Sequence, residues 1–135
     1  MEYPDIDKTD LKILRAITKS ATLKQNDYDA VNDLLIITDD ELANILYEDS
    51  NKKLSPEERR DLYKRINKLS ATPAYITFSS ECSIDGAKEF KLDTKLLWAE
   101  STIHKNGNDE IIEAEYRIYR IYTLKFIADK MLNFI

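Results

Sequence analysis

The sequence predicts an α+β fold, with helices in the N-terminal half and strands in most of the C-terminal half. Between residues 7 and 72, apolar residues recur at the three- and four-residue spacing of amphipathic helices. After Pro73 the spacing changes toward the two-residue alternation of strands, interrupted by the turn dipeptides Asp85-Gly86 and Asn106-Gly107. A run of helices followed by a run of strands is typical of α+β proteins.

The composition fits one globular domain spanning residues 1–135. Of the 135 residues, 43% are hydrophobic and 33% are charged, which suffices for a core without disulfides. Cys82 is the only cysteine, as expected in a reducing compartment. The acidic N-terminus lacks the apolar segment of a secretory signal, and no apolar run reaches the roughly 18 residues of a membrane span. We therefore expect a cytoplasmic protein that does not engage a membrane.

The helical part is expected to span residues 7–72 and to begin with a helix near Asp7 or Thr9. Its apolar stripe consists of Leu11, Leu14 and Ile17. The polar residues after Ser20 predict a loop. Four apolar residues then indicate a short helix: Tyr28, Val31, Leu34 and Leu35.

Two capping boxes predict the next helices. Thr38 and Glu41 have the spacing of the first box, and the helix that follows is expected to bury Leu42, Ile45 and Leu46. The second box lies in LSPEERRDLYKRINKLS, residues 54–70. There Ser55 is the N-cap, Pro56 takes the first helical position and Glu58 completes the box. An apolar stripe of Leu62, Ile66 and Leu69 follows, and Pro73 limits the helix at its end.

The strand part is expected to span residues 74–122. Its strands are Tyr75–Phe78, 95–103 and 111–122, and Asn106-Gly107 is a strong hairpin signal between the last two. In the last strand, one face is predicted to hold Ile112, Ala114, Tyr116 and Ile118. A stripe of Leu124, Ile127, Met131 and Phe134 or Ile135 predicts a C-terminal helix over 123–135.

Charge is distributed unevenly along this acidic chain, whose net charge is −5. Residues 26–51 contain eight acids and no base, whereas residues 52–68 contain seven bases and three acids. Such runs are most often solvated helix faces. The alternative is that the basic helix is a binding surface and the acidic segment faces away from it or binds a protein partner.

The sequence offers little support for catalysis, so no catalytic residue, cofactor or metal site is predicted. His104 is the only histidine and stands beside a predicted turn. Asp27 and Asp29 resemble the start of a calcium loop, but Asn32 stands where that loop needs glycine. One cysteine and one histidine cannot complete a zinc site. The eight tyrosines could stack on bases, although a core or dimer face is the commoner role.

Three stretches resemble parts of a winged-helix DNA-binding domain. IDKTDLKIL is similar to the first helix of many bacterial winged-helix regulators, and ITDDELANIL to the supporting second helix. LSPEERRDLYKRINKLS followed by AYITF is similar to a recognition helix that runs into the first wing strand. Within that superfamily, the chain most resembles the N-terminal module of plasmid replication initiators, which also follow this helix with several strands and a further helix.

This resemblance implies sequence-specific binding of double-stranded DNA by a replication initiator or transcriptional regulator of a mobile element, acting as a homodimer. The candidate dimer surfaces are residues 111–122 and 123–135. The predicted DNA contacts lie before, along and beyond the third helix: Lys52, Lys53, Arg59, Arg60, Tyr63, Lys64, Arg65, Asn67 and Lys68, with Lys105 and Asn106 at the hairpin tip. The alternative is an acidic protein-interaction or dimerisation module that binds no nucleic acid, in which the 26–51 segment contacts the partner.

Overall fold

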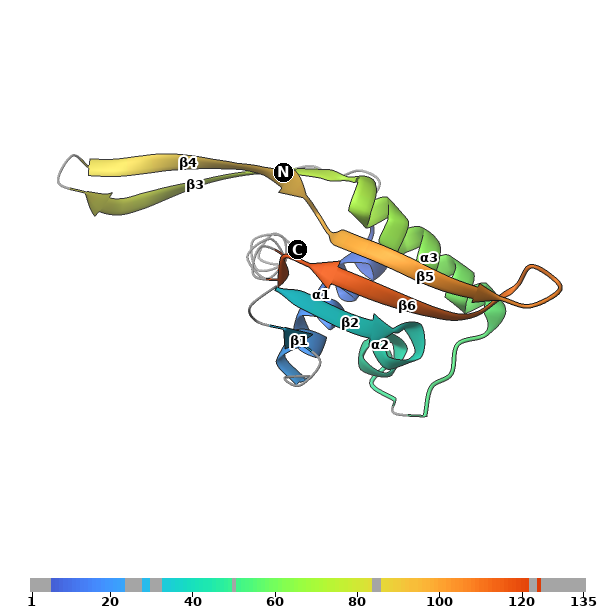
Figure 1. The fold of residues 1–135 in the computed structure, drawn as a ribbon. Helices are drawn as coiled ribbons and strands as arrows, with labels where there is room; N and C mark the ends of the chain where they lie inside the picture. Colours follow the sequence, from blue (N-terminus) through green and yellow to red (C-terminus); the bar gives the residue numbers. More distant parts are fainter. Residues whose placement is uncertain are drawn as a thin grey trace.

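A computed structural model describes residues 6–23, 28–29, 33–49, 51–83, 86–121 and 124, and it has the predicted α+β composition. The elements follow in the order α1 (Lys8–Leu23), β1 (Tyr28–Asp29), β2 (Leu34–Thr38), α2 (Asp39–Leu46), α3 (Pro56–Ala71), β3 (Pro73–Ser83), β4 (Gly86–Lys95), β5 (Trp98–Lys105) and β6 (Ile111–Tyr119). Figure 1 shows their arrangement.

The strands form two separate antiparallel sheets. Four of them make a sheet in the order β1-β2-β6-β5, and the three helices pack on one side of it. β3 and β4 pair only with each other among the described strands, and this long hairpin extends away from the larger sheet (Figure 1). The turn predicted at Asp85-Gly86 falls at its tip, where Ser83 pairs with Gly86 and Asp85 itself lies outside the described residues.

Both predicted capping boxes are confirmed. The Glu41 amide donates to Thr38 Oγ1 at 3.2 Å, and the Glu58 amide donates to Ser55 Oγ at 3.2 Å. In each box the glutamate side chain accepts from the amide of the capping residue in return. Because these bonds satisfy amides that a helix leaves without partners, they fix where α2 and α3 begin.

The short helix predicted from Tyr28 to Leu35 was wrong, because its described residues form strands. β2 pairs with β6 along its whole length, with Leu35 opposite Ile118 and Ile37 opposite Tyr116. Leu35 and Ile37 are fully buried while Ile36 between them is exposed, which is the two-residue alternation of a sheet. The run LLIIT is apolar at four consecutive positions and therefore hides this alternation in the sequence.

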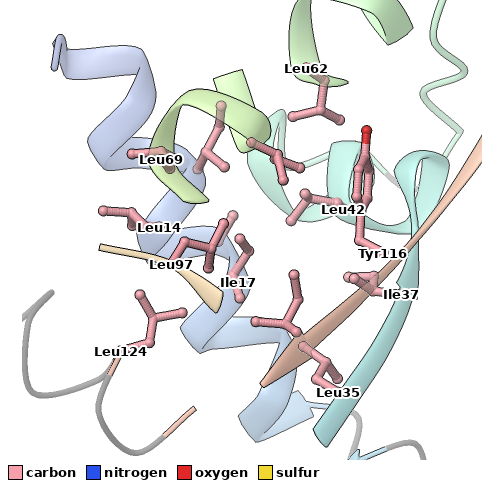
Figure 2. Packing of buried hydrophobic residues seen from close by; sticks show 14 of the residues in the cluster. Leu14, Ile17, Leu35, Ile37, Leu42, Leu62, Leu69, Leu97, Tyr116 and Leu124 are labelled. Carbon is pink, nitrogen blue, oxygen red and sulfur yellow. The ribbon is translucent and has the colours of Figure 1, made fainter. Parts of the chain in front are cut away.

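One core joins the helices to the sheet. The predicted stripes of α1 and α3 are buried in it, apart from half-buried Leu11, and Figure 2 shows how leucines and isoleucines of the helices interleave with those of β2. Tyr116 extends from β6 into this layer and is fully buried. Tyr116 is thus a core residue and cannot stack on a base.

β6 differs from the sequence prediction in two ways, in the side-chain burial at its N-terminal end and in its position within the sheet. A register shift against His104 and Lys105 leaves Ile112 exposed at 49%, while Ile111 is buried instead. β6 is also the strand between β2 and β5, so both of its edges are already paired. Strand pairing with a second copy through residues 111–119 is therefore excluded.

The predicted C-terminal helix over 123–135 lies outside the described residues except for Leu124, which is helical and buried. The other candidate dimer surface falls in this segment. Within the described residues, no helix is long and apolar enough to cross a membrane.

Candidate nucleic-acid interface

The bases around α3 divide into those that form ion pairs with acids and those that are exposed without an ion pair to any described residue. Ion pairs within 4 Å engage four of the seven bases of residues 52–68: Lys52, Arg59, Arg65 and Lys68. Three have no ion pair with any described residue: Lys53, Arg60 and Lys64. The basic run is therefore partly a set of structural ion pairs and partly a free surface.

Arg59 connects α3 to the start of α2. It is only 8% exposed, and its guanidinium donates to Asp39 Oδ1 at 2.7 Å and to Asp40 Oδ2 at 3.1 Å. Burial alone would lower the pKa of Arg59, but these two carboxylates raise it above its ordinary value. Asp39 is fully buried, so Arg59 neutralises a charge that would otherwise lie unpaired in the core. We therefore remove Arg59 from the predicted DNA contacts and Asp39 and Asp40 from the predicted outward acidic surface.

Arg65 and Lys68 connect α3 to the start of α1. Arg65 donates to Asp7 at 2.9 Å, to Asp10 at 3.0 Å and to Asp61 at 3.0 Å, and Lys68 also pairs with Asp10. The hydrogen bond from Arg65, followed by that from the Asp10 amide, lowers the pKa of Asp7 to about 2. These bases hold two helices together, which leaves them poorly placed to bind phosphates.

Asp7→Asn is expected to lower the stability at neutral pH by less than about 1 kcal/mol, because the ion pair is partly exposed. Asparagine can still cap α1, so the substitution removes mainly the charge. A carboxylate with a depressed pKa stabilises the fold above its ordinary pKa, and this contribution is lost as the pH falls from about 4 to about 2. Urea unfolding of both proteins across that range should show the difference vanish. A difference that stays constant at low pH would contradict the assignment.

The polar side chains at the tip of the β5–β6 hairpin interact with other residues of the same turn. Lys105 pairs with Asp109 at 3.0 Å, and Asn106 Oδ1 accepts from the amides of Asn108 and Glu110. Asn106 Nδ2 donates to Glu110 Oε1 at 3.2 Å. Because its polar atoms shape the turn, we remove Asn106 from the predicted DNA contacts, and Lys105 is offset by its acidic partner.

The outward face of α3 keeps Arg60, Lys64 and Asn67 exposed, with Lys53 just before the helix. At 100° per residue these three helical residues lie on the side opposite Leu62 and Ile66. A hollow of about 340 Å³ lies beside them, lined by Pro56, Glu57, Arg60, Asp61, Lys64 and Glu110. Since Glu110 follows the hairpin tip, the tip and the N-terminal half of α3 share this side of the molecule. Tyr63 packs against the core and is not part of the exposed set.

Sequence reasoning missed a second basic surface, on α1. Its members are exposed and have no ion pair with any described residue: Lys8, Lys12, Arg15 and Lys19. Their spacing of four, three and four residues places them in one line along a helix. This spacing was the available signal, and it was overlooked because the four bases are dispersed among apolar residues that form the buried face.

The residues considered for catalysis and metal binding can be located in part. His104 is exposed on β5, and no group of three or more potential metal ligands was found in the part of the chain that the structure describes. The proposal that the protein is not an enzyme rests on the weak sequence signals for catalysis.

Comparison with protein-family models, with curated proteins and with solved structures found no match to this chain.

Proposed function

We propose that this protein binds double-stranded DNA through the exposed face of α3. The observation that carries the proposal is that some basic residues of this helix form ion pairs with the rest of the protein and others do not. Arg59, Arg65 and Lys68 are held by acids of α1 and α2, whereas Arg60 and Lys64 remain exposed without an ion pair among the described residues. Long basic side chains that are not engaged in ion pairs can reach phosphates and base edges.

The order of elements supports a winged-helix reading. α2 and α3 are followed by strands, as in the resemblance, although β1 and β2 stand between α1 and α2. β5, its turn and β6 form a hairpin beside α3. The β3–β4 hairpin inserted between α3 and β5 is additional to a minimal wing. Such extra strands after the helix favour the resemblance to the N-terminal module of plasmid replication initiators over a simple regulator.

The chemistry expected of this face follows from its residue types. Arg60 can donate two hydrogen bonds to a guanine edge, and Asn67 can pair with adenine in the major groove. Lys64 and Lys53 are expected to bind phosphates on either side. Glu57 and Asp61 border the same face and would repel DNA that is not correctly seated.

Under this proposal the protein acts as a replication initiator or transcriptional regulator of a mobile element such as a plasmid. We expect it to bind as a homodimer, because groove-reading proteins commonly occupy paired half-sites. Selection from random oligonucleotides would identify the site, since a direct repeat favours an origin and an inverted repeat favours an operator.

Binding should depend steeply on salt. Fluorescence anisotropy with a labelled duplex is expected to show log K falling against log salt concentration by about 0.9 for each phosphate neutralised, so by at least about 1.8 if Lys53 and Lys64 each hold one phosphate. Affinity that is absent at low salt, or that does not change with salt, would contradict the proposal.

One observation favours the alternative of a protein-interaction module. A groove of about 210 Å³ between the helices is lined by apolar residues that include Ile13, Leu54 and Leu62. Its charged lining consists of three acids, Glu57, Glu58 and Asp61, and one base, Arg65. Such a groove suits an apolar side chain flanked by bases. A heparin column at low salt separates the two functions, because a DNA-binding protein is retained despite a pI near 5.0, whereas an acidic interaction module passes through.

A further inference from the structure

The four bases of α1 form a continuous positive line, the basic stripe, made of Lys8, Lys12, Arg15 and Lys19. At 100° and 1.5 Å per residue, they fall within about 60° of one another and extend over about 16 Å. Asp10 is the only acid of α1, and it is fully buried against Arg65 and Lys68. No acidic residue of α1 therefore interrupts the stripe.

This arrangement does not serve the stability of the helix. Like charges three and four residues apart repel one another on a helix surface, and the stripe contains three such neighbouring pairs. No described acid offsets them within ion-pair distance, although elsewhere in this acidic chain most bases near α3 are paired. An anionic ligand would relieve the repulsion.

The stripe also borders a concave surface. A hollow of about 360 Å³ between α1 and α2 is lined by Lys12, Arg15 and Lys19 from the stripe and by Tyr47 and Glu48 from beyond α2. Tyr47 is 52% exposed, so an aromatic ring lies beside three bases. Three bases against one acid make this hollow more positive than the one beside α3, which has two bases against three acids.

The burial of the opposite face of α1 narrows the choice of ligand. Ile13, Leu14 and Ile17 are fully buried in the core, so α1 has no apolar face to insert into a bilayer. A straight row of evenly spaced bases suits a polyanion with evenly spaced charges. We propose that the basic stripe binds the phosphate backbone of duplex DNA, as a second and sequence-independent contact in addition to the one made by Arg60 and Lys64 on the exposed face of α3. This inference rests on the proposed function.

The test compares three charge-neutralised proteins by fluorescence anisotropy over a range of salt concentrations, each with two duplexes of unrelated sequence. Lys12→Gln/Arg15→Gln removes the centre of the stripe, and Arg60→Gln/Lys64→Gln removes the bases on the exposed face of α3. Lys95→Gln/Arg117→Gln is the matched control, because both residues are exposed and belong to neither surface. Lys95 also lies over the Trp98 ring at 4.7 Å, so urea unfolding must show that the control keeps its stability. The stripe variant is expected to weaken binding equally for both duplexes and to reduce the magnitude of the salt slope by about 1.8, since each lost phosphate contact removes about 0.9.

The possible failures can be told apart. If the stripe variant binds DNA like the control while the α3 variant binds more weakly, the inference is wrong and the proposed function stands. If the stripe variant binds DNA more weakly and the α3 variant does not, the DNA contact of the stripe stands. The proposal that the exposed face of α3 binds DNA then fails. A wild-type protein that binds neither duplex overturns both. A stripe variant that instead changes the molar mass measured by light scattering would show a contact between copies and also overturn the inference.

Discussion

Arg59→Met should be the most destabilising single substitution among the bases near α3, lowering the free energy of unfolding by about 3–5 kcal/mol. The reason is the geometry around Asp39. This carboxylate is fully buried and accepts from Arg59 at 2.7 Å, so removal of the guanidinium leaves an unpaired charge in the core. Urea unfolding followed by circular dichroism measures the loss.

The neighbouring residue provides the control. Arg60→Met changes the same charge on an exposed position and should alter stability by no more than about 0.5 kcal/mol. Adding Asp39→Asn to Arg59→Met should recover part of the loss, because no buried charge then lacks a partner. Equal stability of Arg59→Met and Arg60→Met would show that the buried ion pair contributes nothing.

Arg60→Glu/Lys64→Glu should lower the free energy of unfolding by no more than about 1 kcal/mol, because the new glutamates stand three or four residues from each other and from Glu57 and Asp61. The same variant should lose duplex affinity by at least about 100-fold. Each base contact or phosphate contact that becomes a repulsion costs at least a factor of about ten. Both residues are exposed and make no ion pair with a described residue, so the fold does not depend on them. Anisotropy with the duplex recovered by selection measures the change.

Lys95→Glu/Arg117→Glu changes the net charge by the same amount as Arg60→Glu/Lys64→Glu. It therefore controls for a general electrostatic repulsion between the protein and DNA. Arg117 lies on the face of β6 that alternates with buried Tyr116 and Ile118, so it points away from the helices. This control should retain most of its affinity. If both double variants lose affinity equally, α3 has no special role in binding.

The sequence alone predicted the features that depend on residues close together in the chain. Ser55, Pro56 and Glu58 define the start of α3 within four residues, so its first turn could be read directly. The Asn106 turn is equally local. β2 was missed because LLIIT is apolar at successive positions, and its alternation becomes visible only against β6, about 80 residues later.

The same difference between local and long-range contacts explains why some predicted DNA-binding residues, such as Arg59, were wrong. Arg59 and Arg60 are adjacent and chemically identical, yet only Arg59 is buried. Arg59 precedes Leu62 by three residues and Ile66 by seven, so it lies on the apolar stripe, and this spacing was a usable signal. Its partner Asp39 stands 20 residues earlier, however, and only the tertiary fold reveals that the acidic and basic runs pair with each other.

The central claim, that the outer face of α3 binds DNA, is tested most directly by NMR titration of the ¹⁵N-labelled protein with the selected duplex. The account predicts that backbone amides of Arg60, Lys64 and Asn67 are among those whose chemical shifts change, and that these changes disappear in Arg60→Glu/Lys64→Glu. Shift changes that spare all three residues, or that persist in the double variant, would contradict it.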